Sequence, residues 1–124
     1  MPKIMIVDNN LTYAQMLAET LKTKISSSVI SVSANRTDLI EQFKHFSPDI
    51  VFIDVQSMGS ACFKLTKTFK THRLALRIIW ITSHDQPEYI EKAKDSGVDY
   101  CLSKNSINSD GIIDIIFIEH KSDR

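Results

Sequence analysis

The chain has 124 residues, which is the size of one domain with a hydrophobic core of its own. Its 15 basic and 15 acidic residues give a formal net charge of zero, so the domain lacks the positive field that nucleic-acid binding by charge requires. The three glycines, at positions 59, 97 and 111, exclude the glycine-rich phosphate loops of dinucleotide-binding and P-loop enzymes.

Short apolar runs rich in β-branched residues predict five strands. They lie at residues 4–7, 28–34, 50–53, 78–81 and 99–103. Continuous apolar runs, in contrast to alternating ones, are typical of strands that are covered on both faces, as in a parallel sheet. The last run is only moderately apolar, so we expect that strand at an edge of the sheet.

Segments with apolar residues at helical spacing alternate with these strands. They lie at residues 11–21, 39–46, 62–69 and 90–94. Pro48 precedes the third strand, Pro87 suits the first turn of the fourth helix, and Gly97 is a helix stop. The order predicts a (βα)5 domain over residues 1–124, in which a five-stranded parallel sheet carries helices on both faces.

Residues 111–118 are compatible with either a strand or a helix. The alternation of strands and helices favours a helix. On such a helix the apolar side chains surround the axis except near Asp114, and this stripe is wider than one sheet can cover. Ile115 and Ile118 would therefore stay exposed unless a second surface covers them.

Polar residues follow four of the five predicted strands. They are Asp8, Asp54, Thr82 and Lys104. The carboxyl ends of parallel strands meet at one edge of an open sheet, which is where ligands bind. Two carboxylates offer hard oxygen ligands for Mg²⁺, a hydroxyl donates to an anionic oxygen, and an ammonium pairs with a phosphate. The set indicates phosphoryl transfer with a carboxylate as the nucleophile.

The chain resembles the receiver domains of two-component response regulators over nearly its whole length. The matching segments are residues 3–8, 48–54, 77–83 and 97–104. The resemblance implies a flavodoxin-like fold in which Asp54 accepts a phosphoryl group from the phosphohistidine of a sensor histidine kinase or phosphotransfer protein. Thr82 takes the position of the switch hydroxyl, and Lys104 that of the phosphate-pairing lysine. Such a domain is not an enzyme acting on a separate substrate, because it catalyses only its own phosphorylation and slow dephosphorylation.

The resemblance also implies a Mg²⁺ site made by Asp8, Asn9, Asp54 and the backbone carbonyl of Gln56. The family usually has a second acid where this chain has Asn9. An amide oxygen can coordinate a cation but adds no charge, so we expect weak Mg²⁺ binding.

Further departures from the family pattern leave an alternative open. Segment 57–59 lacks the usual proline, Cys101 stands where an aromatic residue is common, and Asn105 stands in place of a proline. Together with Asn9, these departures allow a degenerate receiver that acts as a phosphorylation-independent protein-interaction module. A flavin or nucleotide binder on the same fold is disfavoured, because the acid at position 8 would repel an anionic phosphate.

We expect the signal to leave through the face made by the predicted fourth helix, fifth strand and last helix. Phosphorylation places a phosphoryl group with about 1.5 to 2 negative charges beside the strands that underlie this face. The uncovered apolar side chains of the last helix predict a homodimer contact or an output domain there. We expect no direct nucleic-acid binding by the domain itself. The sequence fits both a stand-alone receiver and the N-terminal part of a longer regulator. It does not identify the kinase.

The cysteines and the apolar segments bear on where the protein works. Cys62 and Cys101 lie too far apart in sequence for a Cys-rich zinc site or a disulfide framework, so the expected location is the reducing cytoplasm. The first apolar run is too short for a signal-peptide core, and no segment approaches the roughly 18 apolar residues of a membrane span. We therefore expect no association with a membrane.

Overall fold

The computed structural model describes residues 2–34, 37–83, 87–104 and 109–122. Side chains are described for the same ranges except 87–90, 109 and 117–122.

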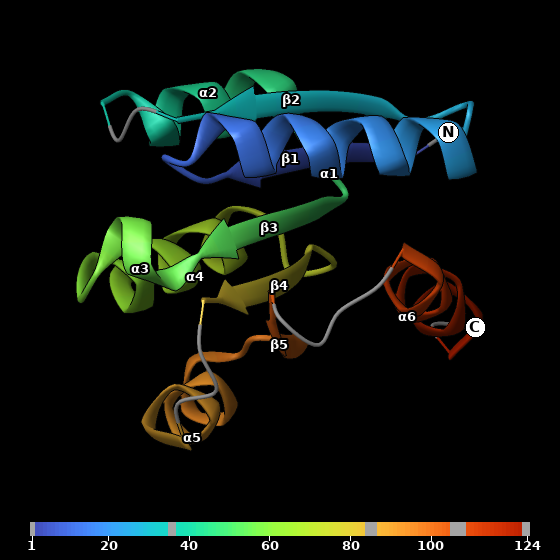
Figure 1. Ribbon diagram of the computed structural model, residues 1–124. Coiled ribbons are helices and arrows are strands. Elements are labelled where there is room, and N and C mark those ends of the chain that lie inside the picture. The colour runs from blue at the N-terminus through green and yellow to red at the C-terminus, as the bar shows by residue number, and fades with distance from the viewer. Residues whose placement is uncertain (1, 35–36, 84–86, 105–108, 123–124) are drawn as a thin grey trace.

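In the described part of the chain, five strands form one sheet in the order β2-β1-β3-β4-β5 (Figure 1). They are β1 (Lys3–Val7), β2 (Val29–Ser33), β3 (Ile50–Asp54), β4 (Arg77–Thr82) and β5 (Tyr100–Ser103). Every neighbouring pair is parallel, which confirms the predicted sheet. The fifth strand lies at an edge, as its weaker apolar character predicts, whereas all five residues of the central strand β3 are buried.

Six helices connect or follow these strands within the described residues. They are α1 (Leu11–Lys24), α2 (Leu39–Phe46), α3 (Val55–Met58), α4 (Ala61–His72), α5 (Pro87–Ser96) and α6 (Ser109–Ser122). Five of them match the predicted helical segments. Helix α5 begins at Pro87, and Gly97 follows it with a φ of 82°, which is the left-handed conformation that suits a glycine after a helix.

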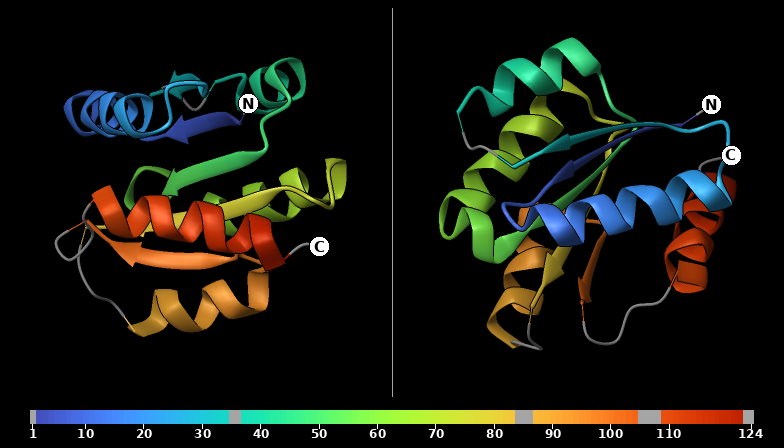
Figure 2. Two further views of the ribbon diagram at one scale, coloured as in Figure 1. Left: turned by 90° about the vertical axis from the view of Figure 1, so that its right-hand side faces the viewer. Right: turned by 45° about the horizontal axis from the view of Figure 1, so that its top comes forward.

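The helices cover both faces of the sheet (Figure 2). Helices α2, α4 and α5 pack on one face through a cluster that includes Phe43, Phe69 and Trp80. Helices α1 and α6 pack on the other face, where Leu17 and Ile112 are buried against the alternate residues of the same strands. Because successive strand residues point to opposite faces, continuous apolar strands fill both layers at once.

The segment that is ambiguous in the sequence is the helix α6. Its Ile112 and Ile116 are buried, and Ile113 and Ile115 are half-buried against the same cluster. The sequence leaves Ile115 exposed unless a second surface covers it, and in the structure this side chain is half-buried, because α6 packs against α1 as well as against the sheet. The side chain of Ile118 lies outside the described residues.

One short helix, α3, has no counterpart among the predicted elements. It follows β3 directly, and Asp54 is its N-cap, whose side chain accepts a hydrogen bond from the backbone N–H of Ser57. Four residues are too few to show an apolar period, so the helix is visible in the sequence only through this capping pair. No helix in the described residues has the length and apolar character needed to cross a membrane.

Candidate functional site

Four polar residues predicted to converge lie at the carboxyl ends of neighbouring strands. Asp8 follows β1, Asp54 ends β3, Thr82 ends β4 and Lys104 follows β5. The two aspartates and Thr82 are between 2% and 4% exposed, so they form a buried polar cluster at this edge of the sheet. The backbone N–H of Lys104 donates to the Thr82 carbonyl at 2.8 Å, which joins the ends of β4 and β5.

Lys104 brings the two carboxylates together. Its Nζ lies 3.0 Å from Asp8 Oδ2 and 3.3 Å from Asp54 Oδ1. One ammonium between two carboxylates leaves a net charge of −1, which attracts a cation less strongly than two unpaired carboxylates would. Lys104, which the family resemblance gives as the phosphate-pairing lysine, thus pairs with the two aspartates in this structure.

Each aspartate has a fixed orientation. Asp8 Oδ1 accepts a hydrogen bond from the backbone N–H of Asn10 at 2.9 Å, so its Oδ2 faces Lys104. Asp54 Oδ2 accepts from the backbone N–H of Ser57 at 2.9 Å. Asp54 Oδ1 is buried and accepts no hydrogen bond from the described residues, although Lys104 Nζ lies within ion-pair distance of it. The two oxygens of Asp54 are therefore chemically distinct.

Tyr13 of α1 covers Lys104. The Nζ of Lys104 lies 4.2 Å from the centre of the Tyr13 ring, a cation–π contact. Burial raises the pKa of the Tyr13 phenol, and the negative charges of Asp8 and Asp54 raise it further. The phenol thus stays protonated in the neutral pH range, and its ring holds the lysine toward the two aspartates.

Ser57 is a site residue that the sequence reasoning missed. Its Oγ lies 2.6 Å from Asp54 Oδ2, 2.8 Å from Asn9 Oδ1 and 3.4 Å from Asp8 Oδ1, and it accepts a hydrogen bond from the backbone N–H of Asn9 at 3.0 Å. The signal for it is the spacing Asp-x-x-Ser, which is typical of an N-cap and the third residue of a helix.

A comparison with known protein families agrees with this geometry. The family model of the response regulator receiver domain matches residues 4–117. The chain belongs to this family. It is therefore a receiver domain of the kind found in two-component systems, as its motifs indicate.

Several curated proteins are similar to this receiver domain. The transcriptional regulatory protein LnrK of Bacillus subtilis (strain 168) is 25% identical over 120 residues, which cover 97% of this chain and 54% of LnrK. VraR of Staphylococcus saprophyticus is 23% identical over 108 residues, covering 87% of this chain and 52% of VraR. The chemotaxis protein CheY of Halobacterium salinarum is 24% identical over 102 residues, covering 82% of this chain and 83% of CheY. The chain thus spans about half the length of LnrK and VraR and most of the length of CheY.

Solved structures confirm the flavodoxin-like fold. The signal receiver domain of a DNA-binding response regulator (merR) from Colwellia psychrerythraea 34H matches with a TM-score of 0.83 at 18% identity, over 100% of both chains. A response regulator from Burkholderia pseudomallei with a phosphorylated aspartic acid, calcium ion and citrate matches with a TM-score of 0.80 at 15% identity, over 98% of this chain and 73% of that one. At these identities the likeness establishes the fold of the receiver.

Receiver domains typically bind Mg²⁺ in an acidic pocket, and the donors present here fit that ion. Asp8, Asn9 and Asp54 bring three oxygen atoms together around Ser57 Oγ, and hard oxygen ligands are those that Mg²⁺ prefers. Among the described residues, no group of three or more His, Cys, Asp or Glu side chains forms a metal site. The pocket has the two carboxylates of Asp8 and Asp54, and Asn9 adds an amide oxygen without a charge.

Gln56 lies in α3, and Thr82 ends β4. Gln56 is predicted to act through its backbone carbonyl, while its exposed side chain accepts a hydrogen bond from the backbone N–H of Ser83 at 2.9 Å. This bond ties the start of α3 to the end of β4. Thr82 is buried at the end of β4, next to Ser103 in the register of the sheet.

The remaining residues considered in the sequence have structural roles or lie outside the described part. Trp80 is fully buried, and its Nε1–H donates to Thr66 Oγ1 at 2.9 Å, which confirms its place in the core. Burial raises the pKa of the Cys62 thiol to about 12, so it is not a reactive thiol. Cys101 is half-buried against the same core cluster, and burial also raises its pKa. Asn105 lies outside the described residues.

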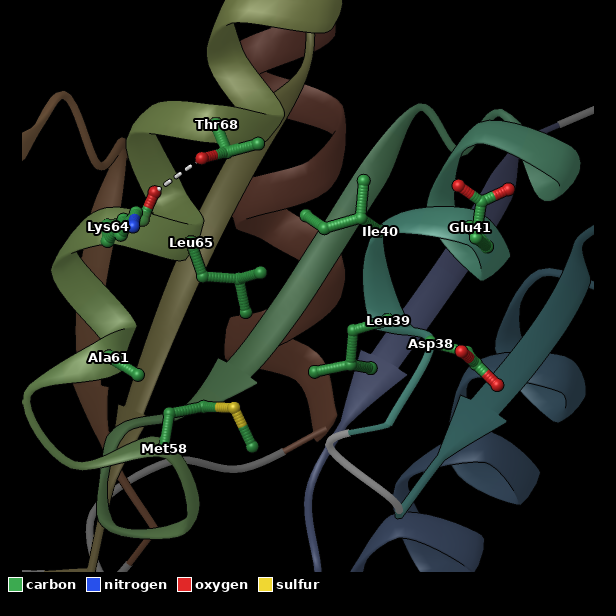
Figure 3. Close-up of a pocket in the computed structure, with 9 residues that line it drawn as sticks. All are labelled: Asp38, Leu39, Ile40, Glu41, Met58, Ala61, Lys64, Leu65 and Thr68. Atoms are coloured by element: carbon green, nitrogen blue, oxygen red, sulfur yellow. Dashed lines mark hydrogen bonds between the residues drawn. The ribbon is translucent and has the colours of Figure 1, made fainter.

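A cavity of about 440 Å³ lies between α2 and α4 (Figure 3). Its lining residues are Asp38, Leu39, Ile40, Glu41, Met58, Ala61, Lys64, Leu65 and Thr68. None of the four strand-end residues lines this cavity, so it is separate from the acidic cluster.

Proposed function

We propose that this receiver domain is a phosphorylation switch in which Asp54 accepts a phosphoryl group from the phosphohistidine of a sensor histidine kinase or of a phosphotransfer protein. One observation carries the proposal. Asp54 Oδ1 is a buried carboxylate oxygen that accepts no hydrogen bond within the part of the chain that the structure describes, and it lies 3.3 Å from a lysine ammonium at the ligand-binding edge of the sheet. An oxygen in this position has a lone pair available for attack and a cation beside it to stabilise the transferred group.

Asp54, Lys104 and Thr82 each have a separate role in the proposed phosphoryl transfer. The P–N bond of the phosphohistidine breaks, a P–O bond forms to Asp54, and the imidazole leaves as a neutral ring after taking up a proton. Lys104 then pairs with a phosphoryl oxygen, and the Thr82 hydroxyl donates to another. Mg²⁺ held by Asp8, Asn9, Asp54 and the Gln56 carbonyl would neutralise phosphoryl charge when bound.

The switch is proposed to act through α5, β5 and α6. Phosphorylation replaces the single charge of the Asp54 carboxylate with a phosphoryl group that carries about 1.5 to 2 negative charges, and this group draws Lys104 and the Thr82 hydroxyl toward it. Support for this route comes from the hydrogen bond between the Lys104 N–H and the Thr82 carbonyl, which joins the ends of β4 and β5. A second copy of the domain or an output domain is proposed to contact this face. Relatives such as LnrK are transcriptional regulatory proteins and are about twice as long as this chain.

The organisation of the whole protein is also a proposal. We propose that residues 1–124 are a receiver that either stands alone or forms the N-terminal part of a longer regulator, and that it works in the cytoplasm. The chain itself is proposed to contact proteins and not nucleic acid, which agrees with its zero formal net charge.

A second candidate is a degenerate receiver that binds partners without phosphorylation. The observation that favours it is the hydrogen bond from the Ser57 hydroxyl to Asp54 Oδ2 at 2.6 Å. With Lys104 between the aspartates, this bond engages Asp54 Oδ2 without a cation. The second candidate predicts that Asp54→Asn leaves partner binding unchanged.

Phosphorylation with acetyl phosphate and Mg²⁺, followed by intact-mass spectrometry, distinguishes the two candidates. We expect the wild type to gain the mass of one phosphoryl group and Asp54→Asn to gain none. Asp49→Asn is the matched control, because Asp49 lies at the opposite end of β3, where it pairs with Arg73, and this variant should still be labelled. A wild type that takes up no phosphoryl group supports the degenerate receiver instead.

A further inference from the structure

We propose that the Ser57 hydroxyl fills the cation position of this pocket in the metal-free protein and competes with a divalent cation for Asp54 and Asn9. The inference rests on the proposed function, because it takes the acidic pocket as the place where the cation of the phosphorylation reaction binds.

Ser57 Oγ is surrounded by oxygen acceptors. Asp54 Oδ2, Asn9 Oδ1 and Asp8 Oδ1 lie 2.6, 2.8 and 3.4 Å from it. A hydroxyl has one proton, so it can donate to only one of the three. Asp54 Oδ2 is the closest acceptor, and a hydrogen bond to an ionised oxygen is the strongest choice. Three oxygens from three residues therefore face one hydroxyl proton, in a place whose chemistry suits a cation.

Asp54 Oδ2 is already fully engaged. It accepts the Ser57 hydroxyl and also the Ser57 backbone N–H at 2.9 Å. The hydroxyl in turn accepts the backbone N–H of Asn9 at 3.0 Å, which holds Ser57 Oγ where it is. A cation that binds Asp54 Oδ2 and Asn9 Oδ1 needs the lone pairs that now face Ser57 Oγ. The hydroxyl proton must leave Asp54 Oδ2 before the cation can bind.

Lys104 also weakens the attraction of the pocket for a cation. Lys104 pairs with both aspartates, and Asn9 contributes no charge, so the pocket carries −1 without a cation. Ser57 is 9% exposed, so water has limited access to replace its hydrogen bond to Asp54. The metal-free pocket is therefore stabilised from within, and this stabilisation opposes binding of the cation.

The test is the dissociation constant of Mg²⁺, measured by isothermal titration calorimetry on the wild type, Ser57→Ala and Ser60→Ala. We expect Ser57→Ala to bind Mg²⁺ about tenfold more tightly, which is the effect of removing one charge-assisted hydrogen bond that the ion must otherwise break. Ser60→Ala is the matched control, because Ser60 is exposed and its side chain makes no capping hydrogen bond to α4, so its affinity should equal that of the wild type. Weaker binding by Ser57→Ala would make the hydroxyl a ligand, and unchanged binding would remove any competition. Either result overturns the proposal.

A second variant keeps the test decisive if Ser57→Ala fails to fold, which circular dichroism in EDTA will show. Ser57→Cys has nearly the same size but a weak donor and a soft sulfur that Mg²⁺ does not prefer, so it should also tighten Mg²⁺ binding. Failure of the proposed function appears in a different measurement, as a wild type that acetyl phosphate does not label at saturating Mg²⁺. Tighter binding by Ser57→Ala supports the competition whether or not that label is found.

Discussion

Replacing Lys104 with methionine should destabilise the protein by about 3 kcal/mol in the absence of divalent cations. The ammonium lies 3.0 and 3.3 Å from two carboxylates whose side chains are only 3% and 5% exposed. At an effective dielectric constant of about 20, each pair attracts by roughly 5 kcal/mol, and the cost of removing three charges from water offsets much of this. Loss of one partner from a buried ion pair typically costs about 3 to 5 kcal/mol, and because the Lys104 side chain is 14% exposed we take the lower end of that range.

The assay is urea unfolding followed by circular dichroism, in EDTA and again in Mg²⁺. Without the lysine, Asp8 and Asp54 repel each other and attract a cation more strongly, so Mg²⁺ should stabilise Lys104→Met more than it stabilises the wild type. Lys67→Met is the control, because Lys67 is an exposed residue of α4 and its replacement should change the free energy of unfolding by less than about 0.5 kcal/mol. A Lys104→Met protein that is as stable as the wild type in EDTA, or that gains no more from Mg²⁺, would refute the account of the pocket.

Three further predictions concern the metal site, a buried thiol and the signalling face. Asn9→Asp should tighten Mg²⁺ binding by about tenfold or more in a calorimetric titration, because it adds a charge to the ligand set, and equal or weaker affinity would contradict this. Burial raises the pKa of the Cys62 thiol from 9.0 to about 12. The folded protein therefore keeps a proton that the unfolded chain loses, and the free energy of unfolding should fall as the pH rises through this range. Urea unfolding of the wild type and Cys62→Ala at several pH values checks this, since a fall of equal size in both proteins would exclude Cys62 as its source. If a second copy binds through the face formed by α5, β5 and α6, beryllofluoride should promote dimers of the wild type in analytical ultracentrifugation and not of Ile118→Asp. If the wild type and Ile118→Asp are both monomers with and without beryllofluoride, pairing through this face has no support.

The sequence predicts the strands and their polar ends because both depend on local residue types. Apolar runs such as 50–53 are buried on both faces in any parallel sheet, and the residues that follow them must then meet at one edge. The convergence of Asp8, Asp54 and Lys104 follows from this rule together with the strand order. The edge position of β5 follows from its weaker apolar character.

The parts that the sequence does not predict depend on contacts between elements. A helix of four residues has no apolar period, so α3 and the contacts of Ser57 appear only once the capping geometry of Asp54 is known. The burial of Ile115 depends on α6 packing against α1, and the spacing of residues along one helix does not show which neighbours it will have. Ser57 also stands in a segment that departs from the family pattern, so the resemblance gives it no role.

Location of the phosphoryl group in the wild type tests the central claim most directly. The protein is treated with acetyl phosphate and Mg²⁺, reduced with borohydride to trap the acyl phosphate, digested and mapped by tandem mass spectrometry. We expect homoserine, the reduction product of an aspartyl phosphate, at position 54 and unmodified residues at positions 8 and 57. A reduced residue at position 8, a phosphoryl group on Ser57, or a fully unmodified position 54 would contradict the assignment of Asp54 as the phosphoryl acceptor.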